Sequence, residues 1–225
     1  RFYNSSLCRF IDMDCLIHSG NTFAYCCNSP ASMHDVCGTT GDYAYDRDKV
    51  IEYGRQYYNK QDPYYPQRSY RNNCVRFASQ CLYAGLGDDI IAEVYPEWHC
   101  YRNNQRDPEN PEEHDQTRSW RKTNYFYRFL MDSGLAYNTT RLYSGWDLGL
   151  MAEWFQYEPG DFLFFSNGNG ADEFYHVAVV SAITENDILF MGNTTDCFDA
   201  SLTAWFQDPE NQEKEVVIVC IADQG

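Results

Sequence analysis

Apolar residues recur at helical spacing soon after residue 44 of the 225-residue chain. The intervals i, i+4, i+7 and i+8 are those of one face of an α-helix. Asp46 stands before the run as a candidate N-cap, and Pro63 would stop the helix after it. The residues of this stripe are Val50, Gly54, Tyr57 and Tyr58.

A second apolar stripe predicts a helix that begins near Asn73. Gly85 and Gly87 follow the stripe, and we expect them to end the helix. Cys74 then stands in its first turn, where unpaired backbone N–H groups and the positive end of the helix dipole stabilise a thiolate. The stripe, at i, i+3, i+4, i+7 and i+8, consists of Cys74, Phe77, Ala78, Cys81 and Leu82.

The middle of the chain predicts a long loop and two further helices. Residues 100–117 are polar and contain Pro108 and Pro111, which is typical of a surface loop. A short helix is expected around 146–155. Before it, a third helix is marked by Tyr125, Phe126, Phe129 and Leu130.

The last third of the chain changes to runs of β-branched and aromatic residues. These runs predict strands that form an antiparallel meander. Because helices come first and strands last, the predicted fold class is α+β, with N-terminal helices packed on an antiparallel sheet. The predicted strands are 161–165, 176–180, 188–191 and 215–221.

The first 44 residues have a different composition, because they contain five of the ten cysteines. They include one candidate hairpin, with arms at 16–18 and 22–25. We therefore expect a cysteine-rich extension, 1–44, and one domain, 45–225. Disulfides are favoured in the extension because it has no C-x-x-C pair, but a metal site and reduced thiols stay open. The five cysteines are Cys8, Cys15, Cys26, Cys27 and Cys37.

The charge of the chain disfavours several classes of partner. Asp and Glu number 33 against 17 Lys and Arg, which gives a formal net charge of −16. Such a charge repels nucleic-acid phosphates and anionic lipid headgroups. No run approaches the roughly 18 apolar residues that a membrane-spanning helix needs. We therefore expect no nucleic-acid partner and no membrane insertion. Separately, we expect no cofactor and no metal at the catalytic site.

Three residues could together carry thiol-based catalysis. Such chemistry needs a nucleophile, a proton acceptor and a group that orients the acceptor. Cys74 lies at the N-terminus of a predicted helix, and His176 is the first residue of a predicted apolar strand. A hairpin turning near 185–186 places Asn193 within about two residues of a cross-strand partner of His176. Taken singly, each residue also fits a structural role, as we infer for the mid-helix Cys81.

Two segments resemble the putative amidase domain family, which is found mainly in Gram-positive bacteria. They are 45–54, with the sequence YDRDKVIEYG, and 73–85, with the sequence NCVRFASQCLYAG. The pairs and runs at 119–120 (SW), 158–161 (EPGD) and 175–180 (YHVAVV) fit as well. The resemblance therefore covers about 45–222.

The resemblance implies a papain-like or NlpC-like cysteine hydrolase. In that fold a cysteine at a helix N-terminus faces a sheet that carries a histidine. Cys74 would be the nucleophile, His176 the general base, and Asn193 the residue that holds the imidazole. The oxyanion donors would be the backbone N–H of Cys74 and the side-chain amide of Asn73.

Two functions follow as hypotheses. The first is a Cys-His(-Asn) hydrolase that cleaves peptide or cell-wall peptide amides through an acyl-enzyme. The second is an inactive, secreted binding module that recognises its partner through the cysteine-rich head. The family commonly has Asp before the nucleophile and Thr-Asn after it, whereas this chain has Asn73 before it and Val75-Arg76 after it. In both cases we expect the protein to be secreted or associated with the cell envelope.

Overall fold

The computed structural model describes residues 3–4, 9–10, 44–65, 73–87, 95, 98–100, 116–168 and 173–222. Contacts divide the chain into two units, Arg1–Ala44 with Gln224–Gly225, and Tyr45–Asp223. In the first unit, β1 (Tyr3–Asn4) and β2 (Arg9–Phe10) pair antiparallel. The hairpin predicted for this extension and its five cysteines lie outside the described residues.

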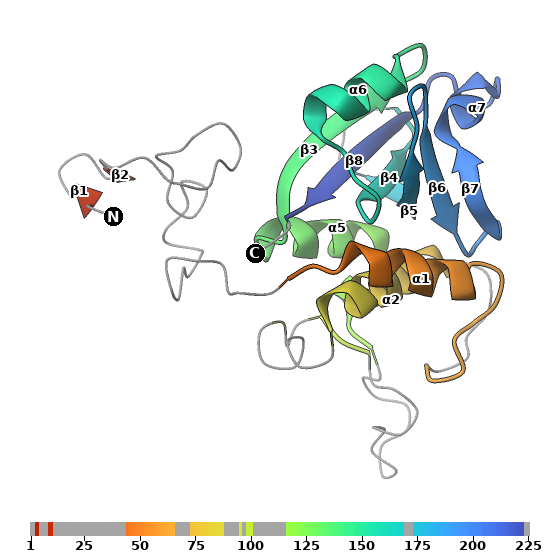
Figure 1. The fold of residues 1–225 in the computed structure, drawn as a ribbon. Helices are drawn as coiled ribbons and strands as arrows, with labels where there is room; N and C mark the ends of the chain where they lie inside the picture. Colours follow the sequence, from red (N-terminus) through yellow and green to blue (C-terminus); the bar gives the residue numbers. More distant parts are fainter. Residues whose placement is uncertain are drawn as a thin grey trace, which may run out of the picture. The chain divides into compact units, whose positions relative to one another are not determined.

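The second unit is built on an antiparallel sheet (Figure 1). Within its described residues six strands are hydrogen-bonded in the order β3-β8-β4-β5-β6-β7. The four predicted strands are confirmed, whereas β3 and β7 were not predicted. The prediction of a simple meander is wrong at β8, because that strand inserts between β3 and β4. The strands are β3 (Ala136–Tyr143), β4 (Phe162–Ser166), β5 (Phe174–Ile183), β6 (Ile188–Gly192), β7 (Cys197–Ser201) and β8 (Glu215–Ile221).

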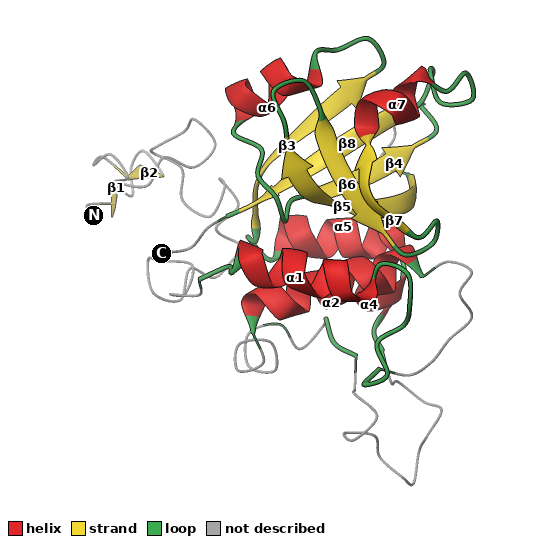
Figure 2. Cartoon of the chain, turned by 45° about the vertical axis from the view of Figure 1, so that its right-hand side comes forward, coloured by secondary structure: helices red, strands yellow, loops and turns green. Residues whose placement is uncertain are grey.

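Helices cover both faces of this sheet (Figure 2). The side chains of α1, α2, α4 and α5 pack against one face, which we call the helix face. Those of α6 and α7 pack against the other, the far face. The predicted α+β class is confirmed. The helices are α1 (Arg47–Tyr57), α2 (Cys74–Leu86), α4 (Arg118–Arg121), α5 (Thr123–Asp132), α6 (Leu148–Phe155) and α7 (Leu202–Gln207).

Strand alternation decides which side chains face which helices. On the helix face, Val177 and Val179 of β5 pack into the core beneath α2. Ala178 and Val180 point into the second core beneath α6 and α7. Because the side-chain period of a strand is two, a shift of one residue moves a side chain from one face to the other.

Local interactions explain where α1 begins and where α2 ends. The Asp46 side chain accepts a hydrogen bond from the Lys49 N–H at 3.1 Å and caps α1 as predicted. The prediction that Gly85 helps to end α2 is wrong, since it lies inside the helix. A Cβ there would lie 2.5 Å from Val50 Cγ2, so the glycine lets α1 and α2 approach closely. Gly87, with φ of +85°, ends the helix.

None of the helices formed by the described residues has the length and apolar character that crossing a membrane would require.

Candidate active site

Cys74 is the first residue of α2, and its side chain is buried beneath the sheet. Burial raises the pKa of its thiol above the usual value of 9.0. Hydrogen bonds from the N–H of Val177, the hydroxyl of Thr194, and the N–H groups of Val75 and Cys74 itself act in the opposite direction. The thiol is therefore neutral at rest, but it already lies among donors that would hold a thiolate or an oxyanion.

Asn193 anchors the N-terminus of α2. It is fully buried, and its amide nitrogen lies 2.6, 2.9 and 3.1 Å from the carbonyl oxygens of Tyr57, Tyr58 and Lys60. Its carbonyl oxygen accepts a hydrogen bond from Nδ2 of Asn73 at 2.5 Å. Asn193 thus ties the end of α1 to the residue that precedes Cys74.

His176 lies on the far face of the sheet. Its ring packs on that of Phe165, with centroids 5.3 Å apart, and Phe165 belongs to the core beneath α6 and α7. A Cβ placed on Gly192 would lie 3.9 Å from His176 Nε2 and 3.7 Å from Cys197 Sγ. Burial lowers the pKa of His176 to about 4, so the imidazole is neutral at pH 7, although it is a weaker base than an exposed imidazole.

A β-bulge puts His176 on this face. Phe165 pairs with His176 and Ser166 with Phe174, so Tyr175 is the extra residue. Phe174 belongs to the helix face, where it packs against Phe164 at a ring separation of 5.3 Å. Regular alternation from Phe174 would have put His176 on the helix face as well, and the bulge reverses it.

The backbone of His176 lies nearer to Cys74 than its imidazole does. Val177, whose N–H is hydrogen-bonded to the Cys74 thiol, is the next residue after His176. Within the described part of the chain, however, the imidazole makes no hydrogen bond to Cys74 or to Asn193. The catalytic roles of these residues therefore stay predictions.

The register explains the position of Asn193. The β5–β6 hairpin is confirmed, with Val179 opposite Met191 and Val180 opposite Phe190. Continued by the same register, His176 would stand opposite Thr194 and not Asn193. Because of this offset of one residue, the amide of Asn193 faces α1 and α2 while the imidazole faces the far side. The predicted orienting role of Asn193 has no hydrogen bond among the described residues to support it.

The side chains near Cys74 in α2 have other partners as well. Asn73, predicted to help hold an oxyanion, directs its amide at Asn193. Arg76 Nε donates to Gln116 Oε1 at 2.8 Å. Cys81 is fully buried in the middle of α2, and burial raises its pKa well above the usual range.

The sequence analysis did not identify two side chains that lie near Cys74 or His176. One is the Thr194 hydroxyl beside the thiol, whose only sequence signal is its place next to Asn193. The other is Cys197, which shares the space above Gly192 with the imidazole. Its sequence signal is equally weak, because it opens a strand that was not predicted.

The described cysteines are all free thiols, and no cluster of three or more potential metal ligands occurs among the described residues. The disulfides predicted for the head fall outside those residues. The free cysteines are Cys74, Cys81, Cys100, Cys197 and Cys220.

The putative amidase domain family matches residues 44–217, which span both α2 and β5. The chain belongs to the putative amidase domain family. This membership indicates a hydrolase of amide bonds and confirms the resemblance noted in the sequence. Searches of curated proteins and of solved structures gave no significant match.

Proposed function

We propose that this amidase-family protein hydrolyses amides through a covalent thioester on Cys74. The observation that carries the proposal is the surroundings of the thiol. It lies at the N-terminus of α2 and is hydrogen-bonded to backbone N–H groups and to the Thr194 hydroxyl. Those are the groups that a developing thiolate or oxyanion requires, and burial makes their electrostatic effect stronger than in water.

In the proposed reaction, His176 takes the proton from the Cys74 thiol as the sulfur attacks the amide carbonyl carbon. The imidazolium returns this proton to the leaving nitrogen, and the C–N bond breaks to give an amine and a thioester. Water then attacks the thioester, the C–S bond breaks, and a carboxylic acid and the thiol are formed. No cofactor enters this sequence of steps.

For this reaction the imidazole has to reach the face that carries the thiol, which requires a change in the backbone bulge at Tyr175. His176 directly precedes Val177, whose N–H is hydrogen-bonded to the thiol, so its Cα already lies close to Cys74. Among the described residues no hydrogen bond holds the ring on the far face, where it packs on Phe165. Catalytic contacts are often formed only when substrate binds.

The proposed substrate is a peptide amide, including those of cell-wall peptides. The net charge of −16 disfavours docking on anionic wall polymers, which favours a peptide without such polymers attached. A papain-like arrangement, and a secreted or envelope-associated location, are part of the same proposal.

A thiol-directed acyl probe tests the proposal, with Cys197→Ala as the matched control because Cys197 is a second free thiol and shares the space above Gly192 with the imidazole. We expect labelling and amide turnover to be lost in Cys74→Ala and retained in Cys197→Ala. Turnover that survives in Cys74→Ala would overturn the proposal.

One observation favours the second candidate function, an inactive binding module. The imidazole rests on the opposite face from the thiol, where its ring packs on Phe165. Equal probe labelling of the wild type and His176→Ala, with no turnover of any amide, would support that function instead.

A further inference from the structure

A cavity of about 280 Å³ lies beside the end of α2 that is remote from Cys74. Its lining includes Gln80, Ala84 and Gly87, the last of which caps the helix. At 1.5 Å per residue, the lining residues of this helix and its cap, from Gln80 to Gly87, lie about 9 to 20 Å along the helix axis from Cys74. The cavity is therefore separate from the candidate active site, and the proposed hydrolase chemistry does not use it.

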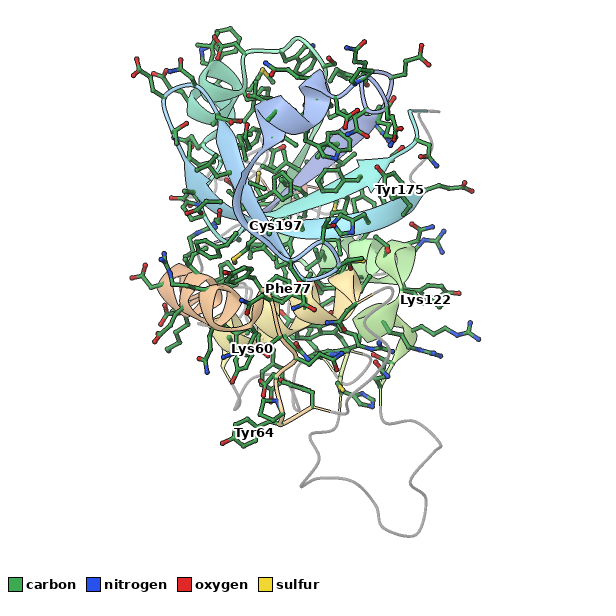
Figure 3. All side chains as sticks on the ribbon, turned by 90° about the vertical axis from the view of Figure 1, so that its right-hand side faces the viewer. Lys60, Tyr64, Phe77, Lys122, Tyr175 and Cys197 are labelled. Carbon is green, nitrogen blue, oxygen red and sulfur yellow. The ribbon has the colours of Figure 1, made fainter. Side chains whose placement is uncertain are left out.

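Tyrosine rings form much of the wall of this cavity. They are Tyr53, Tyr64, Tyr65 and Tyr83. Packing fixes three of them: Tyr53 lies 4.7 Å from Tyr57, and Tyr65 and Tyr83 each lie 5.9 Å from Trp120, measured between ring centroids. Tyr64 is 67% exposed and stands at the opening, on the side of the helices away from the sheet (Figure 3).

A buried carboxylate completes the lining. Asp62 is 5% exposed, and its Oδ2 accepts a hydrogen bond from the Tyr53 hydroxyl at 2.8 Å. Its Oδ1 accepts from the backbone N–H of Tyr64 at 2.9 Å. Burial and the charge of Asp62 raise the pKa of Tyr53, so that its hydroxyl remains a neutral donor.

We infer that this cavity binds an organic ammonium group, of the kind carried by a lysine side chain or a free alkylamine. Aromatic faces attract cations, and a partly desolvated carboxylate adds charge attraction. The volume is at the lower end of the range for ligand pockets and suits an ammonium group with a few carbons. The net charge of −16 also raises the local concentration of cations around the protein.

Binding of two amines to the full chain tests the inference by calorimetry or NMR titration. The probes are n-butylammonium, for a free amine, and Nα-acetyl-lysine N-methylamide, for a peptide side chain. The matched neutral control is Nα-acetyl-norleucine N-methylamide, which has the same backbone and no charge. We expect at least one amine to bind about tenfold more tightly than the neutral control.

Two variants identify the cavity as the site. Asp62→Asn should weaken amine binding about tenfold, and its thermal unfolding should be measured to verify the fold. Tyr64→Leu removes an exposed ring and should weaken binding severalfold, whereas Tyr64→Phe keeps the ring and should not. Because the cavity is remote from the thiol, Cys74→Ala should leave amine binding unchanged.

Equal binding of the norleucine control, or undetectable binding of both amines to the wild type, would overturn the inference. So would amine binding that is the same in Tyr64→Leu and Tyr64→Phe. These outcomes are independent of whether any amide is hydrolysed.

Discussion

The two faces of the sheet hold the two halves of the predicted dyad in different ways. On the helix face, the thiol of Cys74 lies among several hydrogen-bond donors, and Asn193 fixes the start of its helix through four hydrogen bonds. On the far face, the ring of His176 contacts that of Phe165 and borders the space above Gly192, which it shares with Cys197. The proposed nucleophile is thus positioned by a network, while the proposed base, among the described residues, is held by packing alone.

This difference shows how the site could separate rest from catalysis. A buried neutral thiol and a half-buried neutral imidazole on opposite faces have little mutual reactivity. A change in the bulge at Tyr175, which sets the face of His176, would bring them onto one face. The following experiments either break the network of the helix face or show on which face the imidazole works.

The largest effect is expected for His176→Ala. Removal of a general base typically lowers the rate by about 10²- to 10⁴-fold, and we expect a loss of kcat/KM in that range for a peptide amide. The variant should remain folded, because His176 is only half-buried and makes no hydrogen bond within the described residues.

Cys197→Ala is the control for this variant, because it removes a side chain from the same face and from the same space above Gly192. It should keep activity close to that of the wild type. Full activity in His176→Ala would show that the imidazole stays on the far face and takes no part in the reaction.

A loss of stability is expected for Asn193→Ala. The change leaves three carbonyl oxygens and the Asn73 amide without their partner in a buried site. Since each unsatisfied buried polar group costs about 1–3 kcal/mol, and solvent will reach some of them, we expect a loss of roughly 3 kcal/mol in urea unfolding.

Asn73→Ala is the graded control, because it removes only one of these hydrogen bonds and should cost about 1 kcal/mol. If Asn193 instead orients His176, the main effect of Asn193→Ala will be a fall in kcat at nearly unchanged stability. The ratio of the two effects therefore separates an anchor of α2 from an orienter of the imidazole.

The sequence predicts those parts of the molecule in which one residue type dominates an element. The run 215–221 is almost entirely apolar and β-branched, and it forms β8 within the bounds expected. The place of Cys74 at the start of α2 also followed from spacing. By contrast, β3 (Ala136–Tyr143) is a polar, half-buried edge strand, which leaves no clear hydrophobic alternation to detect.

The arrangement of the site was harder to predict than its members. Spacing predicted the β5–β6 hairpin, which is observed, and placed His176 and Asn193 near each other at its open end. It could not show the bulge at Tyr175, which reverses the face of His176, because a bulge depends on how β5 pairs with β4 and not on its own residues. The tyrosines of the amine-binding cavity are likewise brought together only by tertiary contacts.

The smallest expected effect concerns the pH dependence of kcat/KM, which reports the essential groups of the free enzyme. Burial on the far face lowers the pKa of His176 to about 4, and protonation removes the base as the pH falls through this value. We expect kcat/KM at pH 5.5 to stay close to its value at pH 7. An imidazole that is exposed to solvent and has the ordinary pKa of 6.5 would instead give about a tenfold loss at pH 5.5.

The measurement needs a peptide amide without ionisable groups, and circular dichroism should verify that the protein stays folded between the two pH values. An acid limb near 6.5 would contradict the buried resting position, because it would place the imidazole of the free enzyme in water.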